Sequence, residues 1–422
     1  MKLQRAKGTR DYLPEEEIIR EEILSIIKKI FEKYGFSPIE TPIIERYDIL
    51  SAKFAAGEES DVMGEIFAFT DRGKRKLGLR YEFTFALARL IGMNPQIKMP
   101  FKRYQLGKIF RDGPIKLGRL REFWQCDVDI VGVKDLIADA EIISITKEVF
   151  TELKLNTIIK VSSRKLLKNV LDSVGINKEK QDSIIVTIDK LDKLGKNEVI
   201  KELSSKKLTK EQINKIIKII TTNDLSKIKK EMGDSDGIKE LEELFSLLDK
   251  YKIDFEFNPS LARGLTYYTG PIYEVYLKNS EVTSSVAGGG RWDEMIGNYL
   301  GTTKEYPATG IAFGLEPIME EIKKKIKKTK KTTTKVYIIP IKTRDKSINI
   351  LQELRKNNIN TDIDLLDRSI SKNLDYANKL KIPYVIFIGE KELAKNKVKL
   401  RNMESGKEEL LTLKSLIKKL IK

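Results

Sequence analysis

The chain has 422 residues, 41% hydrophobic and 33% charged, and its 79 Lys and Arg against 62 Asp and Glu leave a formal net charge of +17. This length favours two or three domains, and the basic excess favours a polyanionic partner such as nucleic acid, although a lysine-rich solvated surface explains it equally well. The absence of histidine and the single cysteine, Cys126, exclude an internal disulfide, the usual zinc sites and Ser-His or Cys-His nucleophilic chemistry.

The first residues, MKLQRAKGTRDYLP, lack the apolar segment of a secretory signal peptide. No apolar run elsewhere approaches the length that spans a bilayer. Because the chain also has only one cysteine, the sequence predicts a cytoplasmic protein with no membrane partner.

The first part of the chain combines one long helix with many short strands. Pro14 opens a segment with apolar residues at helical spacing, and Gly35 stops it. Residues 36–50 form an extended stretch that contains two prolines. Over residues 64–133 short apolar runs alternate with turns, which predicts an antiparallel sheet of hairpins interrupted by one helix at 84–91.

The composition changes further along the chain. Aromatic residues nearly vanish over residues 164–252, where Lys, Leu, Ile and Glu recur at a helical period, which indicates a helical insertion. Strand-like runs return from residue 253 to about 313. A basic low-complexity run follows, and beyond it strands alternate with helices, which predicts a small α/β domain with a mainly parallel sheet.

These segments predict four parts. An α+β domain on an antiparallel sheet comprises residues 1–163 and 253–322, and the helical insertion at 164–252 interrupts it. A basic linker at 323–334 leads to the C-terminal α/β domain at 335–422.

The predicted hairpin at 107–132 is the most informative stretch for chemistry. Arg111 ends its first strand, and residues two apart on the second strand share one face. The polar residues at this spacing are Arg119, Arg121, Gln125, Asp127 and Asp129. Two cations and an amide followed by carboxylates favour a ligand cleft, because arginine suits phosphate and carboxylate oxygens. A salt-bridged outer face of the sheet is the alternative.

Two further stretches carry polar side chains suited to a small ligand. Glu82 and Thr84 precede the predicted helix and offer acceptors for an ammonium group, although Thr84 would serve equally as a helix cap. LARGLTYYTGP places Arg263, Tyr267 and Tyr268 between two predicted strands. A permanent cation beside two phenols favours a site that binds a nucleotide and a small polar molecule side by side.

Two glycine-containing stretches give weaker signals. The triple glycine of AGGGRWDEM allows the backbone to approach a ligand or another strand closely. TGIAFGLEPI predicts a strand, a turn at Gly314 and a helix start, a junction that binds an anion in some proteins and is purely structural in others.

Together these stretches resemble the histidyl-tRNA synthetases over nearly the whole chain. KGTRDYLP is similar to the N-terminal signature of that family, and GFSPIETPIIE resembles the first class II motif, which implies a dimer interface. The stretch from IFRD to EFWQCDVDIVG resembles the second motif, LARGLTYYTGP and GGGRWD look like the two histidine-specific motifs, and TGIAFGLEPI resembles the third motif. The C-terminal α/β segment is similar to the family's anticodon-binding domain.

The resemblance implies a set of histidine-binding residues. They are Glu82, Thr84, Gln125, Asp129, Tyr267 and Tyr268. In this reading Glu82 and Thr84 hold the α-amino group, while Asp129 and Tyr268 bind the imidazole nitrogens.

The resemblance also implies ATP-binding residues, which are Arg111, Arg119, Arg121 and Arg263. Arg263 and Arg111 would be catalytic at the α-phosphate, and the other two would reach the outer phosphates. The implied activity is ATP-dependent ligation of L-histidine to tRNA(His) through a histidyl-adenylate, by a homodimer. Mg²⁺ would accompany ATP, with no protein-bound metal.

One departure from the family pattern stands out. The third motif of the family usually ends in an arginine that reaches ATP, and Pro317 stands at that position here. The alternative function is therefore a synthetase-like paralogue with a regulatory or binding role that does not charge tRNA. Such paralogues generally lack the C-terminal domain, which is present in this chain.

Overall fold

The computed structural model describes residues 2–52, 62–115, 118–326 and 329–421. These residues form two compact units. The first comprises the residues up to Arg10 together with Ile23–Lys325, and the second comprises Asp11–Glu22 together with Ile326–Lys422. Helix α1 (Pro14–Lys33) begins at the predicted proline. It ends just before Gly35, whose φ of +79° takes the chain out of the helix.

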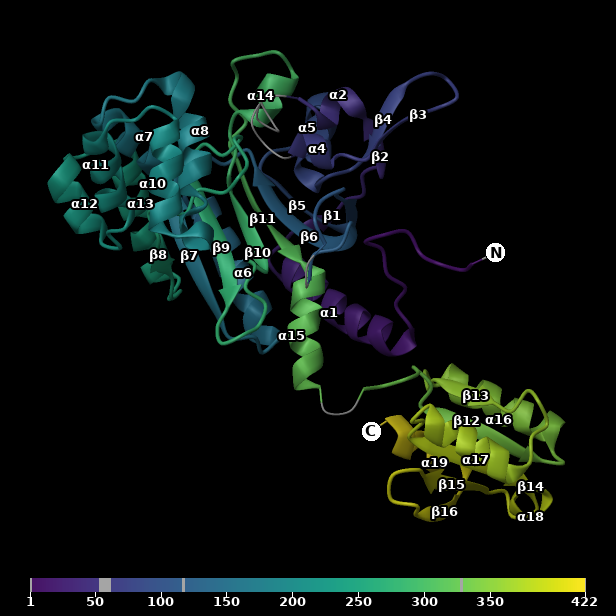
Figure 1. The fold of residues 1–422 in the computed structure, drawn as a ribbon. Coiled ribbons are helices and arrows are strands. Elements are labelled where there is room, and N and C mark those ends of the chain that lie inside the picture. Colours follow the sequence, from purple (N-terminus) through teal and green to yellow (C-terminus); the bar gives the residue numbers. More distant parts are fainter. Residues whose placement is uncertain (1, 53–61, 116–117, 327–328, 422) are drawn as a thin grey trace. The chain divides into compact units, whose positions relative to one another are not determined.

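The first unit is built on an eight-stranded sheet with the order β1-β5-β6-β11-β10-β9-β7-β8 (Figure 1). The six central strands pair antiparallel, as predicted, whereas the outer pairs β1–β5 and β7–β8 are parallel, so the whole sheet is mixed. The strands are β1 (Ser37–Pro38), β5 (Phe101–Phe110), β6 (Glu122–Val131), β7 (Thr157–Ser163), β8 (Glu256–Phe257), β9 (Pro271–Leu277), β10 (Ala287–Arg291) and β11 (Ala308–Gly314).

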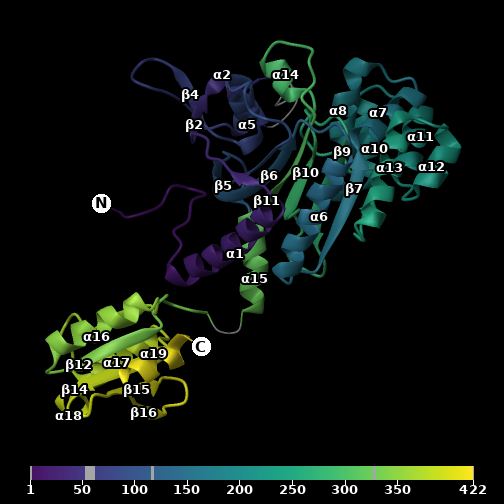
Figure 2. The same ribbon diagram turned by 180° about the vertical axis from the view of Figure 1, so that it is seen from behind.

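One face of this sheet packs against helices. Phe313 of β11 contacts Phe31 of α1 and Phe150 of α6 (Ile137–Glu152), with ring centroids 5.8 and 5.7 Å apart. All three rings are fully buried. Figure 2 shows these two helices on that side of the sheet. The apolar residues of the central strands therefore face a helical layer, and the alternate residues face the opposite side.

Strand register places a row of residues across that opposite face. In neighbouring strands Glu274 pairs with Gly288, Gly288 with Ala312, Ala312 with Asp127, and Asp127 with Gln105. Gly and Ala in the middle of the row leave free space above the sheet, while charged residues stand on either side of that space. The cavity described below lies there.

A three-stranded sheet of order β2-β4-β3 borders the main sheet. It contains β2 (Ile44–Arg46), β3 (Ala68–Thr70) and β4 (Lys76–Leu79), with α2 (Tyr47–Leu50) and α4 (Val62–Glu65) beside it. The sequence analysis placed all strands of residues 64–133 in one antiparallel sheet, and this was wrong for β3 and β4, which belong to the separate small sheet. The predicted helix at 84–91 is confirmed as α5 (Phe83–Met93).

The predicted helical insertion is confirmed. Its helices are α7 (Arg164–Ser173), α8 (Lys178–Ile188), α9 (Leu191–Leu194), α10 (Lys196–Ser205), α11 (Lys210–Ile220), α12 (Leu225–Met232) and α13 (Asp236–Lys250). They gather beside β7 and β9 (Figure 1). The unit is completed by α14 (Met295–Tyr299) and by α15 (Leu315–Lys325), which begins directly after the Gly314 turn as expected.

The second unit contains a five-stranded sheet of order β13-β12-β14-β15-β16. Its elements after residue 335 are β12 (Val336–Ile341), α16 (Arg344–Lys356), β13 (Thr361–Ile363), α17 (Ile370–Lys379), β14 (Tyr384–Gly389), α18 (Glu390–Leu393), β15 (Val398–Asn402), β16 (Glu408–Leu411) and α19 (Leu413–Ile421). The first three strands are parallel, whereas β15 and β16 add two antiparallel pairings, so the α/β prediction is confirmed but the sheet is only half parallel.

Candidate active site

A cavity of about 510 Å³ lies above the open face of the main sheet. Nine of the ten residues predicted for the site line it, which are Glu82, Thr84, Arg111, Arg119, Gln125, Asp129, Arg263, Tyr267 and Tyr268. They come from four separate stretches of the chain. The ligand-cleft interpretation of the 107–132 hairpin thus fits the structure better than a salt-bridged outer face.

The tenth residue, Arg121, is not among the residues that line the cavity. Strand β6 begins only at Glu122, so Arg119 and Arg121 do not continue its face, and that part of the prediction was wrong. Arg121 instead holds the preceding loop, with Nη1 2.8 Å from Asp112 Oδ1. Its backbone N–H donates to the Gly8 carbonyl at 2.9 Å, which anchors the KGTRDYLP stretch.

Three carboxylates stand in the cavity with little exposure to solvent. Burial raises the pKa of Glu82 to about 7, against the lowering charges of Arg111 and Arg263. Burial likewise raises the pKa of Asp129 to about 6, although it forms an ion pair of 2.6 Å with Arg103 of β5. The pKa of Asp127 is raised well above its ordinary range by burial. These sites favour a cationic ligand that compensates the buried negative charge.

Glu82 and Thr84 reach the cavity because α5 begins between them. Glu82 is the N-cap residue, but its side chain makes no capping hydrogen bond, and Thr84 lies inside the first turn. The alternative that Thr84 caps the helix is therefore wrong. Among the described residues, the Oε1 atom of Glu82 and the Oε1 atom of Gln125 have no hydrogen-bond partner although both are buried. Buried acceptors of this kind normally bind a donor.

Arg263 lies in the loop between β8 and β9 and is held at both ends. Its backbone is left-handed, with φ of +56°, a conformation that non-glycine residues adopt rarely. The backbone N–H donates to Asp189 Oδ1 at 2.8 Å, and Nη1 donates to Glu274 Oε1 at 2.8 Å. The guanidinium also lies 5.5 Å from the centre of the Tyr268 ring. A strained backbone secured by two carboxylates positions a fixed cation over the cavity.

The glycines of β10 and β11 make room for these charged side chains. A Cβ atom on Gly288 would overlap Nη1 of Arg263, and a Cβ atom on Gly310 would overlap the carboxylate of Asp129. A Cβ atom on Gly289 would overlap the Gly310 carbonyl oxygen of the next strand. The triple glycine thus permits both close strand packing and close approach of a functional side chain.

The two tyrosines form one wall of the cavity. Tyr267 and Tyr268 are both largely buried, and their hydroxyl oxygens lie 3.5 Å apart. Burial raises the pKa of both phenols, so they are neutral hydrogen-bonding groups at neutral pH.

Two more arginines, Arg111 and Arg119, line the cavity. The Arg111 guanidinium lies 4.3 Å from the centre of the Tyr81 ring, and its Nε donates to the Tyr81 carbonyl at 3.3 Å. Arg119, whose side chain is 45% exposed, forms an ion pair of 2.9 Å with Glu65. Both are partly accessible cations beside the buried carboxylates, which suits a ligand that carries both signs of charge.

Several lining residues had no assigned role in the sequence analysis. Asp189 and Lys190 come from the helical insertion, between α8 and α9, and no local pattern marks them. Glu274 is a carboxylate within the otherwise apolar strand IYEVYL, and that contrast is a usable signal. Trp292 donates a side-chain hydrogen bond that lowers the pKa of Asp129, although burial dominates.

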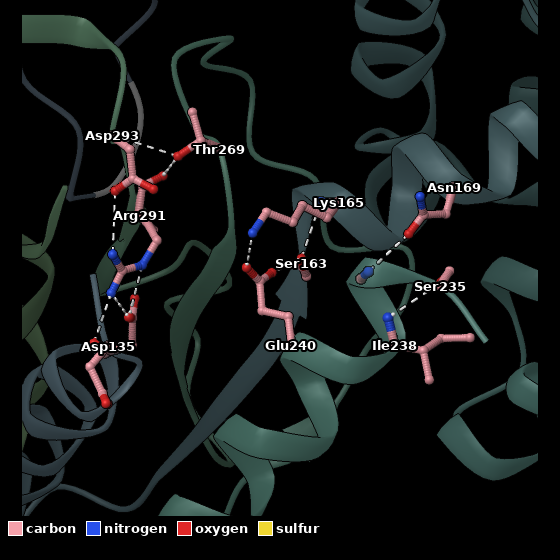
Figure 3. A network of polar contacts seen from close by, with 12 residues as sticks. Asp135, Ser163, Lys165, Asn169, Ser235, Ile238, Glu240, Thr269, Arg291 and Asp293 are labelled. Atoms are coloured by element: carbon pink, nitrogen blue, oxygen red, sulfur yellow. Dashed lines mark hydrogen bonds and ion pairs between the residues drawn. The ribbon is translucent and has the colours of Figure 1, made fainter. Parts of the chain in front are cut away.

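Arg291, which follows the triple glycine, belongs to a buried structural network rather than to the cavity (Figure 3). It pairs with Asp139 of α6 and donates to the Asp135 carbonyl at 3.2 Å. In the same view Glu240 of α13 contacts Ser163 and Lys165 at the start of α7. These contacts fix the insertion and β10 next to the cavity.

Pro317 lies in the first turn of α15, where proline is tolerated, and is buried. A Cβ atom added to Gly118 would lie 3.2 Å from Cβ of Pro317. A Cβ atom added to Gly314 would lie 3.3 Å from Cγ of Pro317. The proline therefore packs against the loop between β5 and β6 and is not among the residues that line the cavity.

Two further properties concern the described residues only. They contain no group of three or more Asp, Glu, His or Cys side chains arranged to hold a metal ion. No helix among them is both long enough and apolar enough to cross a membrane.

The chain is similar to known proteins over nearly its whole length. The family model described as histidyl-tRNA synthetase matches residues 8–318, and the anticodon binding domain model matches residues 335–422. Histidine--tRNA ligase 1 of Bacillus cereus is 42% identical over 429 residues, which cover 99% of this chain and 97% of that protein.

Solved structures show the same relationship. Histidyl-tRNA synthetase from Nostoc sp. PCC 7120 matches with a TM-score of 0.86 and 27% identity, covering 100% of this chain and 99% of that one. A Bacillus halodurans protein described as an ATP phosphoribosyltransferase regulatory subunit/histidyl-tRNA synthetase shares the fold, with a TM-score of 0.75 and 19% identity over 92% of this chain and 98% of its own.

Proposed function

Because the chain belongs to the histidyl-tRNA synthetase family, we propose that it ligates L-histidine to tRNA(His) with ATP, through a histidyl-adenylate. In the first step an oxygen of the histidine carboxylate attacks the α-phosphorus of ATP, the bond to the β-phosphate breaks, and pyrophosphate leaves. In the second step a ribose hydroxyl of the tRNA 3′ end attacks the activated carbonyl carbon, loses its proton, and AMP leaves. Positioning and electrostatics supply the rate of the first step.

The amino acid binds through hydrogen bonds at its ammonium end and at its imidazole end. Glu82 and Thr84 take the α-ammonium group, and Gln125 contacts it from β6. Asp129 and Tyr268 bind the imidazole nitrogens, with Tyr267 beside them. The support for these roles is that all six side chains line one cavity and that two of the acceptors, on Glu82 and Gln125, lack a partner among the described residues.

Arg263 and Arg111 act on the reacting atoms. Arg263 stabilises the negative charge that develops on the α-phosphate. The support for this role is that Asp189 and Glu274 hold Arg263 in place. Arg111 orients the histidine carboxylate and the α-phosphate, since the described residues offer it no carboxylate at ion-pair distance. A fixed, preorganised charge needs no rearrangement during the reaction.

Arg119 covers the outer phosphates, because it is the remaining arginine that lines the cavity. Its contact with Glu65 leaves almost half of its side chain exposed, so it can exchange that partner for a phosphate. Arg121 keeps a structural role in the loop. Mg²⁺ would accompany ATP and would supply positive charge beside the phosphates.

Each of the four parts of the chain has its own role. Residues 1–163 and 253–322 form the catalytic domain, the insertion at 164–252 completes the cavity wall, 323–334 is a linker, and 335–422 bind the anticodon. The basic excess of +17 favours association with tRNA, and tRNA binding should weaken steeply as salt rises.

The protein acts as a homodimer in the cytoplasm. The support for the dimer is that Ile43 and Ile44, in the stretch that resembles the first class II motif, are 43% and 51% exposed. Exposed apolar side chains beside a short edge strand suit burial against a second copy. The single cysteine, which is buried, fits a reducing compartment.

The observation that carries the proposal is the convergence of Glu82, Gln125, Asp129, Arg111 and Arg263 in one cavity. The test is ATP–pyrophosphate exchange with each standard amino acid in turn, without tRNA. Exchange with histidine alone is expected. Exchange with another amino acid would overturn the specificity, and no exchange from folded protein would favour a paralogue that does not charge tRNA, with Pro317 as the first residue to replace by arginine.

A further inference from the structure

Asp127 is a buried carboxylate without a function so far. It lines the cavity and is 3% exposed, yet its Oδ1 atom has no hydrogen-bond partner among the described residues. Its cross-strand neighbour Gln105 bonds to Thr41 instead. Leaving a buried carboxylate oxygen without a donor is costly, and such an atom in a cavity normally meets its partner in a ligand.

The surrounding charges define the chemistry of that ligand. Burial raises the pKa of Asp127 most, the positive charge of Arg103 lowers it, and the negative charges of Asp129 and Glu82 raise it further. Arg103 lies close to Asp129, at 2.6 Å, and Arg263 is engaged by Glu274. Two buried carboxylates, Glu82 and Asp127, therefore keep oxygen atoms free in the described part of the cavity. A cationic donor from a ligand would compensate the charge of such a pair and satisfy both oxygen atoms.

We propose that Asp127 is a second carboxylate, beside Glu82, for the α-ammonium group of the amino-acid substrate. This inference rests on the proposed function and adds a binding residue to it. An ammonium group has three N–H donors. Glu82, Asp127 and the Thr84 hydroxyl supply three acceptors, and Gln125 lies next to Asp127 on the same face of β6.

The register of the sheet gives Asp127 a suitable position. Across the open face, Glu274 of β9 and Asp127 of β6 are separated by Gly288 and Ala312, which makes three strand spacings, or roughly 14 Å. Arg263 extends over Gly288 from the Glu274 side. The phosphate-binding cation and the ammonium-binding carboxylate therefore stand at opposite ends of a floor of small residues, with the amino acid between them.

The imidazole end of the ligand is less suitable for Asp127. Asp129, two residues further along β6, already stands with Trp292 and Tyr268 at that end, and its pKa responds to Arg103 and Trp292. Asp127 lies between Asp129 and Gln125 on the same strand face, one step closer to Gln125 than Asp129 is. Apart from burial, the pKa of Asp127 is affected by Arg103 and Asp129 first, and then by Glu82 and Arg111.

The test is calorimetric binding of three ligands to the full-length wild-type protein and to Asp127→Asn. L-histidine and L-histidinol carry the ammonium group, whereas 3-(imidazol-4-yl)propionate lacks it. Loss of one charge-assisted hydrogen bond should weaken the first two ligands by roughly 10- to 100-fold. Binding of the deaminated ligand should be unchanged or tighter, because a repelling carboxylate has been removed.

Asp129→Asn is the matched comparison on the same strand face, and it should weaken all three ligands. The free Asp127→Asn protein should melt at the same temperature as wild type or higher, since a buried carboxyl with an unpartnered oxygen has been removed. If Asp127→Asn does not fold, Asp127→Ser is measured with the same expectations.

Two results would overturn the inference while leaving the proposed function intact. One is histidine affinity within twofold of wild type, and the other is an equal loss for all three ligands, which would mean that Asp127 only shapes the cavity. If the wild-type protein itself does not bind histidine, the proposed function fails and the inference fails with it.

Discussion

Asp189 of the helical insertion accepts a hydrogen bond of 2.8 Å from the backbone N–H of Arg263, a cation that lines the cavity. The two residues are 74 positions apart in the chain. Arg263 has a left-handed backbone at this point, and the contact compensates part of the roughly 1–2 kcal/mol that such a conformation costs. The insertion therefore contributes to the wall of the candidate site and is not a separate appendage.

Replacing Asp189 by alanine should lower the rate of histidine-dependent ATP–pyrophosphate exchange by about tenfold or more, because Arg263 loses its backbone support. The histidine KM should change little. Asp189→Asn retains an acceptor oxygen and should recover most of the rate.

The control is Asp192→Ala, three residues further along, where the carboxylate is half exposed and pairs with Lys160. Its exchange rate should match wild type. Equal loss in both alanine variants would mean that the insertion contributes only general stability.

Replacing Arg263 itself by alanine should reduce exchange by roughly 10²–10³-fold, since a preorganised charge at the α-phosphate is lost. Affinity for tRNA should stay within twofold of wild type, because Arg263 lies inside the cavity. An exchange rate that is unchanged in folded Arg263→Ala protein would refute its role at the phosphate.

Gly288→Ala tests the floor of the cavity. The new methyl group would occupy the position of the Arg263 guanidinium, so the cation must move and exchange should fall sharply. The backbone of Gly288 has no positive φ, so folding should be retained. Gly64→Ala, in α4, meets nothing within 4 Å and should keep wild-type exchange. Wild-type exchange in Gly288→Ala would contradict the placement of Arg263.

The raised pKa of Glu82, about 7, predicts a pH dependence of histidine binding. The ionised form is needed to bind an ammonium group, so affinity should fall by up to tenfold for each pH unit below 7. Calorimetry between pH 5.5 and 8 would measure it in wild type and in Glu82→Gln. The glutamine variant should bind histidine more weakly and lose this part of the pH dependence.

The free energy of unfolding should change with pH in the opposite direction to the affinity for histidine. Because burial raises the pKa of Glu82 in the folded state, the folded protein binds more protons than the unfolded chain between about pH 4.5 and 7. The stabilising contribution of protonated Glu82 is therefore present at low pH and is lost as the pH rises through 7. Glu82→Gln should gain stability relative to wild type between pH 5 and pH 8, by on the order of 3 kcal/mol. A constant difference across that range would contradict the raised pKa.

The dimer proposal predicts that Ile44→Asp yields a monomer, because a charge would replace an apolar side chain that a second copy buries. Light scattering after gel filtration measures the mass directly. Leu365→Asp, at a 76% exposed leucine outside this stretch, is the control and should keep the wild-type mass. A wild-type protein that is monomeric would refute the dimer.

Local chemistry in the sequence was enough to select most of the candidate site. Charged and amide residues on strand-forming stretches, such as Gln125 and Asp129, contradict the pattern of an ordinary apolar core, and the cavity contains them. The helical insertion and the C-terminal α/β unit could also be predicted, because helical and strand periodicities depend on near neighbours in the chain.

The errors arose where a prediction extended a local pattern too far. Arg121 has the spacing of the β6 face, but the strand begins one residue later, so its side chain serves the loop. The strand pattern at 68–79 is equally correct locally, yet hydrogen bonding places those residues in a separate small sheet.

By itself, the sequence determined the order of the elements, the family resemblance and the residue types that could meet a nucleotide and an amino acid. The tertiary structure alone decided that Asp189 supports Arg263, that Gly288 lies beneath it and that Asp127 faces the cavity without a partner. The physical reason is that strand register and contacts across 74 residues depend on how distant segments pack, and no local periodicity encodes that packing.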